Sequence, residues 1–310
     1  MPINWFPGHM NTTRQKLAAL MPQCDVVVEL LDARIPASSS NPLLDELRRG
    51  VQGKGEDGRP GDLPCVTVLN KVDLADPGVT KAWRETFERE RGVKTVAISV
   101  NQPGEADRVV RLVKKFAPRR VEKGQKVRVV VVGIPNVGKS TLINALRGKR
   151  VASVGDEPAV TKGNQEIDLK NGVVLIDTPG ILWPKFEDQN VGYRLAVSGA
   201  IKDTAIDYDD VAIYAARYLL GHYPNELKAR YKLKELSDDP ITLVTDIGKK
   251  RGCLISGGEV DFNRAGELLL REMRAGKLGR ISLERPDAAA DGDDEAPTAF
   301  TPVPPPPKSW

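Results

Sequence analysis

The fold is decided by the stretch VRVVVVGIPNVGKST, which covers residues 127–141. It joins a valine-rich run to the pattern G-x-x-x-x-G-K-[ST] and leads into a helical pattern, which is the context of a phosphate-binding loop. In such a loop backbone N–H groups surround phosphate oxygens, a lysine reaches the terminal phosphates and a serine hydroxyl binds magnesium. We expect Lys139 to take part in catalysis and Ser140 to bind magnesium. The residues expected at the phosphates are Asn136, Val137, Gly138, Lys139, Ser140 and Thr141.

The segments around this loop alternate between short β-branched runs and amphipathic stretches, from Asp25 to Asp177. Such alternation is typical of an α/β fold, a mostly parallel sheet with helices on both faces. The predicted strands cover residues 26–31, 65–69, 94–98, 127–132 and 173–176. The predicted helices cover residues 42–49, 80–91, 105–116 and 139–146. Residues 52–62 are rich in glycine and charge and are expected to form a surface loop.

The pattern changes beyond about residue 184, where apolar residues recur at helical spacing over 191–220, 226–236 and 260–273. From about residue 286 the chain is rich in Ala, Asp and Pro, a composition typical of disordered segments. We therefore expect an α/β nucleotide-binding domain at residues 1–185, a smaller all-helical domain at 186–285 and a disordered tail at 286–310.

The composition argues against several classes of protein. The longest apolar runs are a few residues long, whereas a membrane-spanning helix needs about 20 apolar residues. The N-terminus lacks the features of a secretory signal, and the three cysteines show no C-x-x-C spacing. We therefore expect a cytoplasmic protein without a membrane span. We also expect a monomer. The net charge of +4 combines an acidic tail with a more basic body, which is compatible with a nucleic-acid partner.

A second motif, DTPG at residues 177–180, follows another apolar run. Asp177 at the end of a strand can hold the water shell of a magnesium ion, and the N–H of Gly180 can meet the γ-phosphate. Thr161 lies in the polar segment between the two motifs, where a switch threonine completes the coordination of magnesium. A threonine in a solvated loop is the alternative interpretation of that position.

A third motif, NKVD, selects the base and consists of Asn70, Lys71, Val72 and Asp73. The carboxylate of Asp73 can accept both the imino and the amino hydrogens of guanine, whereas adenine presents no matching pair of donors. Asn70 is expected to brace the loop, and the stem of Lys71 to lie along the ring. Backbone N–H groups near Ile98 and Ser99, one strand later, are expected to meet the guanine carbonyl oxygen. The predicted ligands are therefore GTP and GDP.

The three motifs occur in an unusual order, because the base-selecting motif precedes the phosphate loop. Ordinary GTPases carry the phosphate loop first, so we expect a circularly permuted domain. With this order, and with WFPGHM at residues 5–10 and DARIP at 32–36, the chain resembles the circularly permuted GTPases of ribosome assembly, most closely the ribosome biogenesis GTPase A (YlqF-type) group. The resemblance covers roughly residues 1–285. It implies hydrolysis of GTP to GDP and phosphate by an assembly factor of the large ribosomal subunit.

The residue that orients the attacking water is not the usual one. Many GTPases place a glutamine directly after the metal-site glycine, but here that position is Ile181, which cannot hydrogen-bond to water. His9 is one of two histidines, and a neutral imidazole brought to the site can orient water or accept its proton. A packed or solvated histidine is the alternative from the residues alone. The resemblance implies the catalytic role for His9.

The resemblance also implies a potassium ion bound by Asn136, placed where other systems insert an arginine to neutralise charge in the transition state. A turn-forming asparagine is the alternative at this position.

Two basic clusters are candidates for contact with RNA, although solvated helix faces look similar. The resemblance implies ribosomal RNA and the precursor of the large subunit as partners. One cluster lies in the helical domain and contains Lys228, Arg230, Lys232, Lys234, Lys249, Lys250 and Arg251. The other precedes the phosphate loop and contains Lys114, Lys115, Arg119, Arg120, Lys123, Lys126 and Arg128.

Three other functions remain open from the sequence. A metabolic kinase with a phosphate loop uses ATP, and Asp73 selects against adenine. A GTP-gated RNA-binding module without hydrolysis fits the apolar Ile181. A GTPase of signalling or RNA modification would bind no ribosomal particle.

Overall fold

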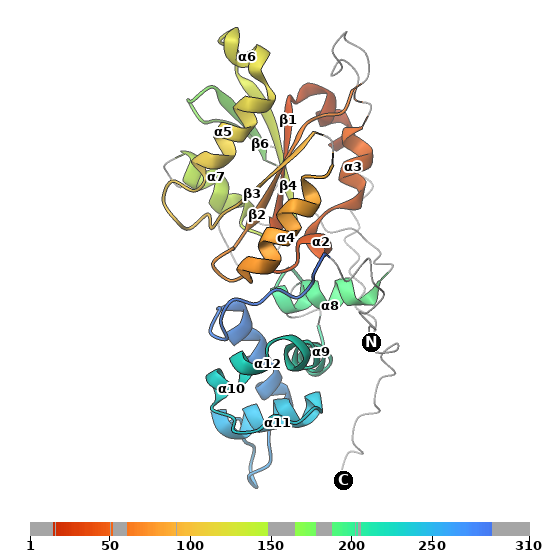
Figure 1. Ribbon diagram of the computed structural model, residues 1–310, viewed down its shortest axis with the longest axis vertical. Coiled ribbons are helices and arrows are strands. Elements are labelled where there is room, and N and C mark those ends of the chain that lie inside the picture. The colour runs from red at the N-terminus through yellow and green to blue at the C-terminus, as the bar shows by residue number, and fades with distance from the viewer. Residues whose placement is uncertain are drawn as a thin grey trace.

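The computed structural model describes residues 15, 17–49, 51, 61–90, 92–147, 165–177, 188–201, 203 and 206–286. A sheet with its covering helices forms the upper part of Figure 1 and a group of helices forms the lower part, with α8 (Gln189–Ser198) between them. The predicted fold class, an α/β unit followed by a helical region, is confirmed. The core of the predicted surface loop (52–60) and the predicted tail from residue 287 lie outside the described residues.

The sheet has six strands in the order β3-β2-β1-β4-β6-β5. Neighbouring strands pair in parallel except β5, which is antiparallel to β6. The strands are β1 (Val26–Asp32), β2 (Cys65–Asn70), β3 (Val93–Ala97), β4 (Val127–Gly133), β5 (Gln165–Asp168) and β6 (Val173–Asp177). The parallel strands are those predicted from the β-branched runs. The sequence did not indicate β5, because its four residues at the sheet edge include a single apolar side chain, Ile167.

Apolar side chains from β1 pack on both faces of the sheet. Val28 and Leu30 share a cluster with residues of α5 and α7, whereas Val27 and Leu31 pack on the side of α3 and α4. Helices on both faces are therefore confirmed. The elements of this part are η1 (Met21–Gln23), α2 (Pro36–Ser39), α3 (Pro42–Arg48), α4 (Pro77–Phe87), α5 (Asp107–Phe116), α6 (Pro118–Glu122) and α7 (Lys139–Arg147).

The helical part continues from α8 with α9 (Tyr208–His222), α10 (Pro224–Tyr231), α11 (Pro240–Arg251) and α12 (Phe262–Arg274). The predicted helical stretch 191–220 is two helices, because Gly199 (φ 83°) ends α8 and Asp207 caps the start of α9. Among the described residues, no helix has the length and apolar character that crossing a membrane requires.

One hydrophobic cluster runs from the sheet into the helical part and includes Val129 of β4, Leu195 of α8 and Leu269 of α12. The two parts therefore share a continuous core. The predicted domain boundary between residues 185 and 186 lies in the stretch 178–187, outside the described residues.

Candidate nucleotide-binding site

The loops that carry the base-selecting and phosphate-binding motifs leave the same edge of the sheet. The first loop follows β2 and the second follows β4, and β1 lies between these two strands. Because the strands are parallel, their carboxyl ends lie at one edge, which is where open α/β sheets bind ligands. The two motifs therefore lie at the same edge of the sheet, although their order along the chain is reversed.

Asn70 joins the two loops directly. Its side-chain amide donates a hydrogen bond of 2.7 Å to the carbonyl of Val137, and its amide oxygen accepts one of 3.0 Å from the N–H of Val100. Asn70 is 1% exposed, so both bonds lie in the protein interior. The predicted bracing by Asn70 agrees with this geometry, and the residue links the segments that carry Asp73, Ser99 and the phosphate loop.

The phosphate loop has the backbone conformation that its sequence requires. Asn136 and Gly138 have positive φ angles of 57° and 102°. A Cβ added to Gly138 would approach the side-chain nitrogen of Asn70 to 2.4 Å, so this close contact between the two loops requires glycine. Lys139 opens α7 and is 6% exposed, and Ser140 and Thr141 follow in the first turn of this helix. The residues predicted at the phosphates are therefore contiguous at the start of α7.

A buried charge network supports the base-selecting loop. Asp32, at the end of β1, accepts two hydrogen bonds from the guanidinium of Arg34, at 2.9 and 2.7 Å, and one of 2.9 Å from Nζ of Lys71. Burial alone would raise the pKa of Asp32, but the charges of Arg34 and Lys71 hold it well below its usual range. The pKa of Lys71 is lowered by its own burial, against the attraction of Asp32. Asp32 and Arg34 belong to the DARIP segment at residues 32–36, and their part in this network was not predicted from the sequence.

Asp73 follows this network on an exposed turn. The turn is closed by a hydrogen bond of 2.9 Å from the N–H of Leu74 to the carbonyl of Lys71, and the N–H of Val72 lies 3.3 Å from the carbonyl of Ile98. Ile98 and Ser99 are buried at the end of β3. The structure thus brings the four residues of the base-selecting motif next to the segment predicted to meet the guanine oxygen.

Asp177 is the last residue of β6, and its backbone pairs with Val131 of β4. The end of β4, which leads into the phosphate loop, and the end of β6 at Asp177 therefore belong to neighbouring strands. Thr161, Gly180 and His9 lie outside the described residues.

The end of α8 contacts both halves of the site. The amide nitrogen of Asn136, the predicted potassium ligand, donates a hydrogen bond of 2.9 Å to the carbonyl of Gly199. Arg34 donates one of 3.1 Å to the carbonyl of Ser198. Arg274 of α12 donates to the carbonyls of Val197 and Ala196, at 3.0 and 2.8 Å. These side chains satisfy carbonyl groups that a helix end leaves without partners inside the helix. No sequence pattern indicates these contacts, because they join residues far apart in the chain.

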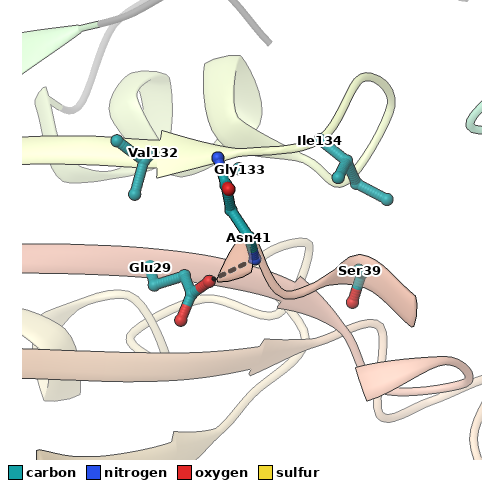
Figure 2. A pocket seen from close by; sticks show the side chains of 6 residues that line it. All are labelled: Glu29, Ser39, Asn41, Val132, Gly133 and Ile134. Atoms are coloured by element: carbon teal, nitrogen blue, oxygen red, sulfur yellow. Dashed lines mark hydrogen bonds between the residues drawn. The ribbon is translucent and has the colours of Figure 1, made fainter. Parts of the chain in front are cut away.

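A small cavity with room for about one water molecule lies beneath the start of the phosphate loop (Figure 2). It is lined by Glu29, Ser39, Asn41, Val132, Gly133 and Ile134. Glu29 accepts hydrogen bonds of 3.0 Å from the N–H of Asn41 and the hydroxyl of Ser40. Burial nevertheless raises the pKa of Glu29 to about 7.

Several members of the predicted basic clusters are held in ion pairs. Arg230 and Arg251 both pair with Glu272, while Arg120, Lys126 and Arg128 pair with Asp25, Asp168 and Glu166. Other members are exposed and have no ion pair among the described residues: Lys115, Arg119, Lys123, Lys228, Lys232, Lys234 and Lys250. The exposed members without an ion pair are therefore better candidates for binding phosphates than the paired ones.

Comparison with known proteins agrees with this geometry. Residues 128–245 match the family described as "50S ribosome-binding GTPase", a match that begins in β4 and leaves out the base-selecting loop. Ribosome biogenesis GTPase A of Priestia megaterium is 46% identical over 297 residues, which cover 93% of this chain and 99% of that protein. A structure of GNP-bound YlqF from T. maritima aligns with a TM-score of 0.57 at 30% identity, over 89% of this chain and 99% of the other. A GDP-bound YlqF structure aligns with a TM-score of 0.58 at 28% identity, over 88% and 99%. Because identity close to one half extends over nearly the whole length of a relative, the chain belongs to the ribosome biogenesis GTPase A family.

Proposed function

We propose that this GTPase hydrolyses GTP to GDP and phosphate and acts as a nucleotide-gated assembly factor of the large ribosomal subunit. The observation that carries the proposal is the 2.7 Å hydrogen bond from Asn70 to Val137, because it joins the loop with the base-selecting motif to the loop with the phosphate-binding motif. The names of the matched family and of the Priestia megaterium relative, a 50S ribosome-binding GTPase and a ribosome biogenesis GTPase, support the ribosomal role. In this proposal the protein acts in the cytoplasm and as a monomer.

In this proposal guanine is bound by the carboxylate of Asp73, with Lys71 along the ring and the N–H groups near Ile98 and Ser99 at the guanine oxygen. Residues 136–141 hold the phosphates, and the N–H of Gly180 meets the γ-phosphate. The buried network around Asp32 supports this role, because it fixes Nζ of Lys71 before the nucleotide binds.

Ser140, Thr161 and Asp177 would hold a magnesium ion, which neutralises charge on the β- and γ-phosphates when bound. His9 orients the attacking water or accepts its proton, and Lys139 stabilises the charge that develops on the γ-phosphate. The amide oxygen of Asn136 would bind a potassium ion, which would neutralise charge in the transition state. The loop geometry supports this arrangement, because Asn136 has a positive φ of 57° in the loop that leads directly to Lys139, the first residue of α7.

The helical domain at residues 186–285 contacts ribosomal RNA. The exposed lysines Lys228, Lys232, Lys234 and Lys250 support this assignment, because lysines outside internal ion pairs remain available to phosphates. Arg230 and Arg251 are held by Glu272 and play a structural part.

The test measures release of phosphate from GTP in single-turnover assays, with and without immature large subunits, and co-sedimentation with those particles. We expect the particles to accelerate hydrolysis and to retain the protein with a GTP analogue, but not with GDP. Absence of hydrolysis under all conditions would favour a GTP-gated RNA-binding module. Hydrolysis without retention on the particle would favour a GTPase of signalling or RNA modification.

His9→Ala tests the catalytic assignment in the same assay, with His222→Ala as the matched control. His222 lies at the end of α9 against the ring of Tyr218, with a centroid distance of 4.3 Å. We expect His9→Ala to remove most of the particle-stimulated hydrolysis while GTP binding persists, and His222→Ala to leave hydrolysis unchanged. Equal rates for the two variants would remove His9 from the mechanism.

A further inference from the structure

The segment after α12 returns to the sheet and lies against the loops that follow β1 and β2. We call residues 281–284 the C-terminal strap; Figure 1 shows it within the dark blue segment that runs from α12 to the sheet. The N–H of Ile281 donates a hydrogen bond of 2.9 Å to the carbonyl of Leu74, and the N–H of Leu283 donates one of 2.7 Å to the carbonyl of Arg34. Alternate residues of the strap thus bind two different loops of the candidate site.

Ser282 is fully buried and bonded on three sides. Its hydroxyl accepts a hydrogen bond of 3.1 Å from the N–H of Asp76, which caps α4. The N–H of Ser282 donates a hydrogen bond of 3.0 Å to the hydroxyl of Tyr223, and that hydroxyl donates one of 3.1 Å to the carbonyl of Ser282. Ser282 therefore connects the segment just after the base-selecting motif to the end of α9.

Glu284 anchors the other end of the strap. Its carboxylate accepts hydrogen bonds from the hydroxyl of Ser38 (2.6 Å) and the N–H of Ser38 (3.0 Å), and lies 3.5 Å from the guanidinium of Arg194. Its carbonyl accepts a hydrogen bond of 3.1 Å from the indole N–H of Trp83 on α4. The strap is thus fixed to elements of both parts of the molecule.

Leu74 is where the strap meets the base-selecting loop. Its N–H closes the turn that contains Asp73, and its carbonyl receives the bond from Ile281. Behind it, Gly276 (φ 69°) comes so close that an added Cβ would lie 2.6 Å from Cδ2 of Leu74. The backbone next to the exposed Asp73 therefore rests on residues that follow α12.

We propose that the C-terminal strap positions the base-selecting loop for guanine, with Ser282 and Gly276 as positioning residues that act through Asp76 and Leu74. The inference rests on the proposed guanine contact of Asp73. Its consequence is that the helical part of the chain sets the preference for the guanine base through the strap, whereas its contact with the phosphate loop runs through the separate bond from Asn136 to Gly199.

The test compares the affinities of the full-length protein for GDP and IDP, measured by calorimetric titration. Inosine lacks the 2-amino group of guanine, so the GDP to IDP ratio reports how well the carboxylate of Asp73 is placed. A hydrogen bond to a charged group predicts a ratio of about tenfold or more for the unsubstituted protein. A loss of overall stability weakens both nucleotides equally and leaves the ratio unchanged.

Two substitutions disturb the strap, and each has a matched control in the helical part. Ser282→Ala removes the acceptor of the Asp76 N–H, and Ser237→Ala removes the acceptor of the Asp239 N–H, at the same 3.1 Å. Gly276→Ala places a Cβ against Leu74 at a φ of 69°, and Gly252→Ala carries the same φ with nothing within 4 Å.

We expect Ser282→Ala and Gly276→Ala to lower the GDP to IDP ratio by about threefold or more, the worth of part of one hydrogen bond, and the controls to keep it. If Gly276→Ala loses its fold, Ser282→Ala decides the question alone. Ratios unchanged in a protein that does prefer GDP would overturn the strap inference and leave the role of Asp73 intact. An unsubstituted protein with no preference would overturn the role of Asp73 and the inference with it.

Discussion

The side-chain amide of Asn136 donates a hydrogen bond of 2.9 Å to the carbonyl oxygen of Gly199. The first residue belongs to the phosphate loop and the second ends α8. The adjacent carbonyl, that of Ser198, accepts from Arg34, which also holds Asp32. The phosphate loop and the network beneath the base-selecting loop thus meet at consecutive carbonyls, so a movement of α8 away from the sheet must break contacts made by both.

Arg274 is expected to hold α8 in this position. Arg274→Ala leaves the carbonyls of Ala196 and Val197 without their side-chain donor and should lower the free energy of unfolding by about 2 kcal/mol. Arg271→Ala, one turn earlier on α12, removes an exposed i,i+4 pair with Glu267 and should cost about 0.5 kcal/mol or less. Urea denaturation of both variants makes the comparison. Equal losses would show that the end of α8 does not depend on Arg274.

Arg34 is expected to be needed for the fold as well as for the site. Among the residues that the structure describes, Arg34→Met leaves Lys71 as the one cation paired with the carboxylate of Asp32, which is 1% exposed. Breaking a buried ion pair in this way should cost about 3 to 5 kcal/mol of unfolding free energy. The double variant Asp32→Asn with Arg34→Met should recover part of that loss, because it removes the buried negative charge that Arg34 no longer neutralises. A double variant less stable than the single one in urea denaturation would contradict this account of the network.

Glu29 predicts a pH dependence of stability. Its pKa is raised from the ordinary value of 4.5 to about 7, so between these values the folded chain binds more protons than the unfolded chain, and stability falls as pH rises. Glu29→Gln keeps an oxygen that can accept from Asn41 and removes the titration. The stability of the variant relative to the unsubstituted protein should therefore rise by about 2 to 3 kcal/mol between pH 4 and pH 8.

Glu272→Gln provides the contrast for this measurement. Burial opposes ionisation of Glu272, but its hydrogen bonds and the charges of Arg230 and Arg251 lower the pKa of its carboxyl. Its ionised form therefore stabilises the fold above the unfolded pKa, and this variant should lose relative stability as pH rises. If Glu29→Gln and the unsubstituted protein show the same change of stability at every pH, Glu29 of β1 does not have a raised pKa in the folded chain.

The sequence allowed prediction of the parallel sheet, because each central strand is a run of apolar, mostly β-branched residues buried on both faces. It also allowed the convergence of residues 70–73 with 136–141 to be expected, since both motifs end parallel strands. Helix α11 was missed although Asp239 caps it, Pro240 opens it and Gly252 ends it. These capping residues, rather than apolar spacing, are the signal of this helix in the sequence.

The contacts that connect the site to the helical part were beyond sequence reasoning. The bond from Asn136 to Gly199 and the bond from Leu283 to Arg34 both end on backbone carbonyls. A carbonyl acceptor leaves no trace in the residue type, and the partners are far apart in the chain. Asp32 and Arg34 did carry a signal, an acidic residue ending an apolar strand with a basic residue two positions later, but such a pair occurs at many strand ends.

The most direct test of the central claim, that Asp73 reads the base of the nucleotide held by residues 136–141, is titration of Asp73→Asn with GTP and with xanthosine triphosphate. Xanthine carries a carbonyl oxygen where guanine carries its amino group, so an asparagine amide can donate to xanthine but cannot replace the carboxylate for guanine. We expect the GTP affinity to fall by about a hundredfold, and the affinity for xanthosine triphosphate to rise above that of the unsubstituted protein. Unchanged GTP affinity in Asp73→Asn, together with loss of GTP binding in Lys139→Ala, would place the base elsewhere and contradict the account.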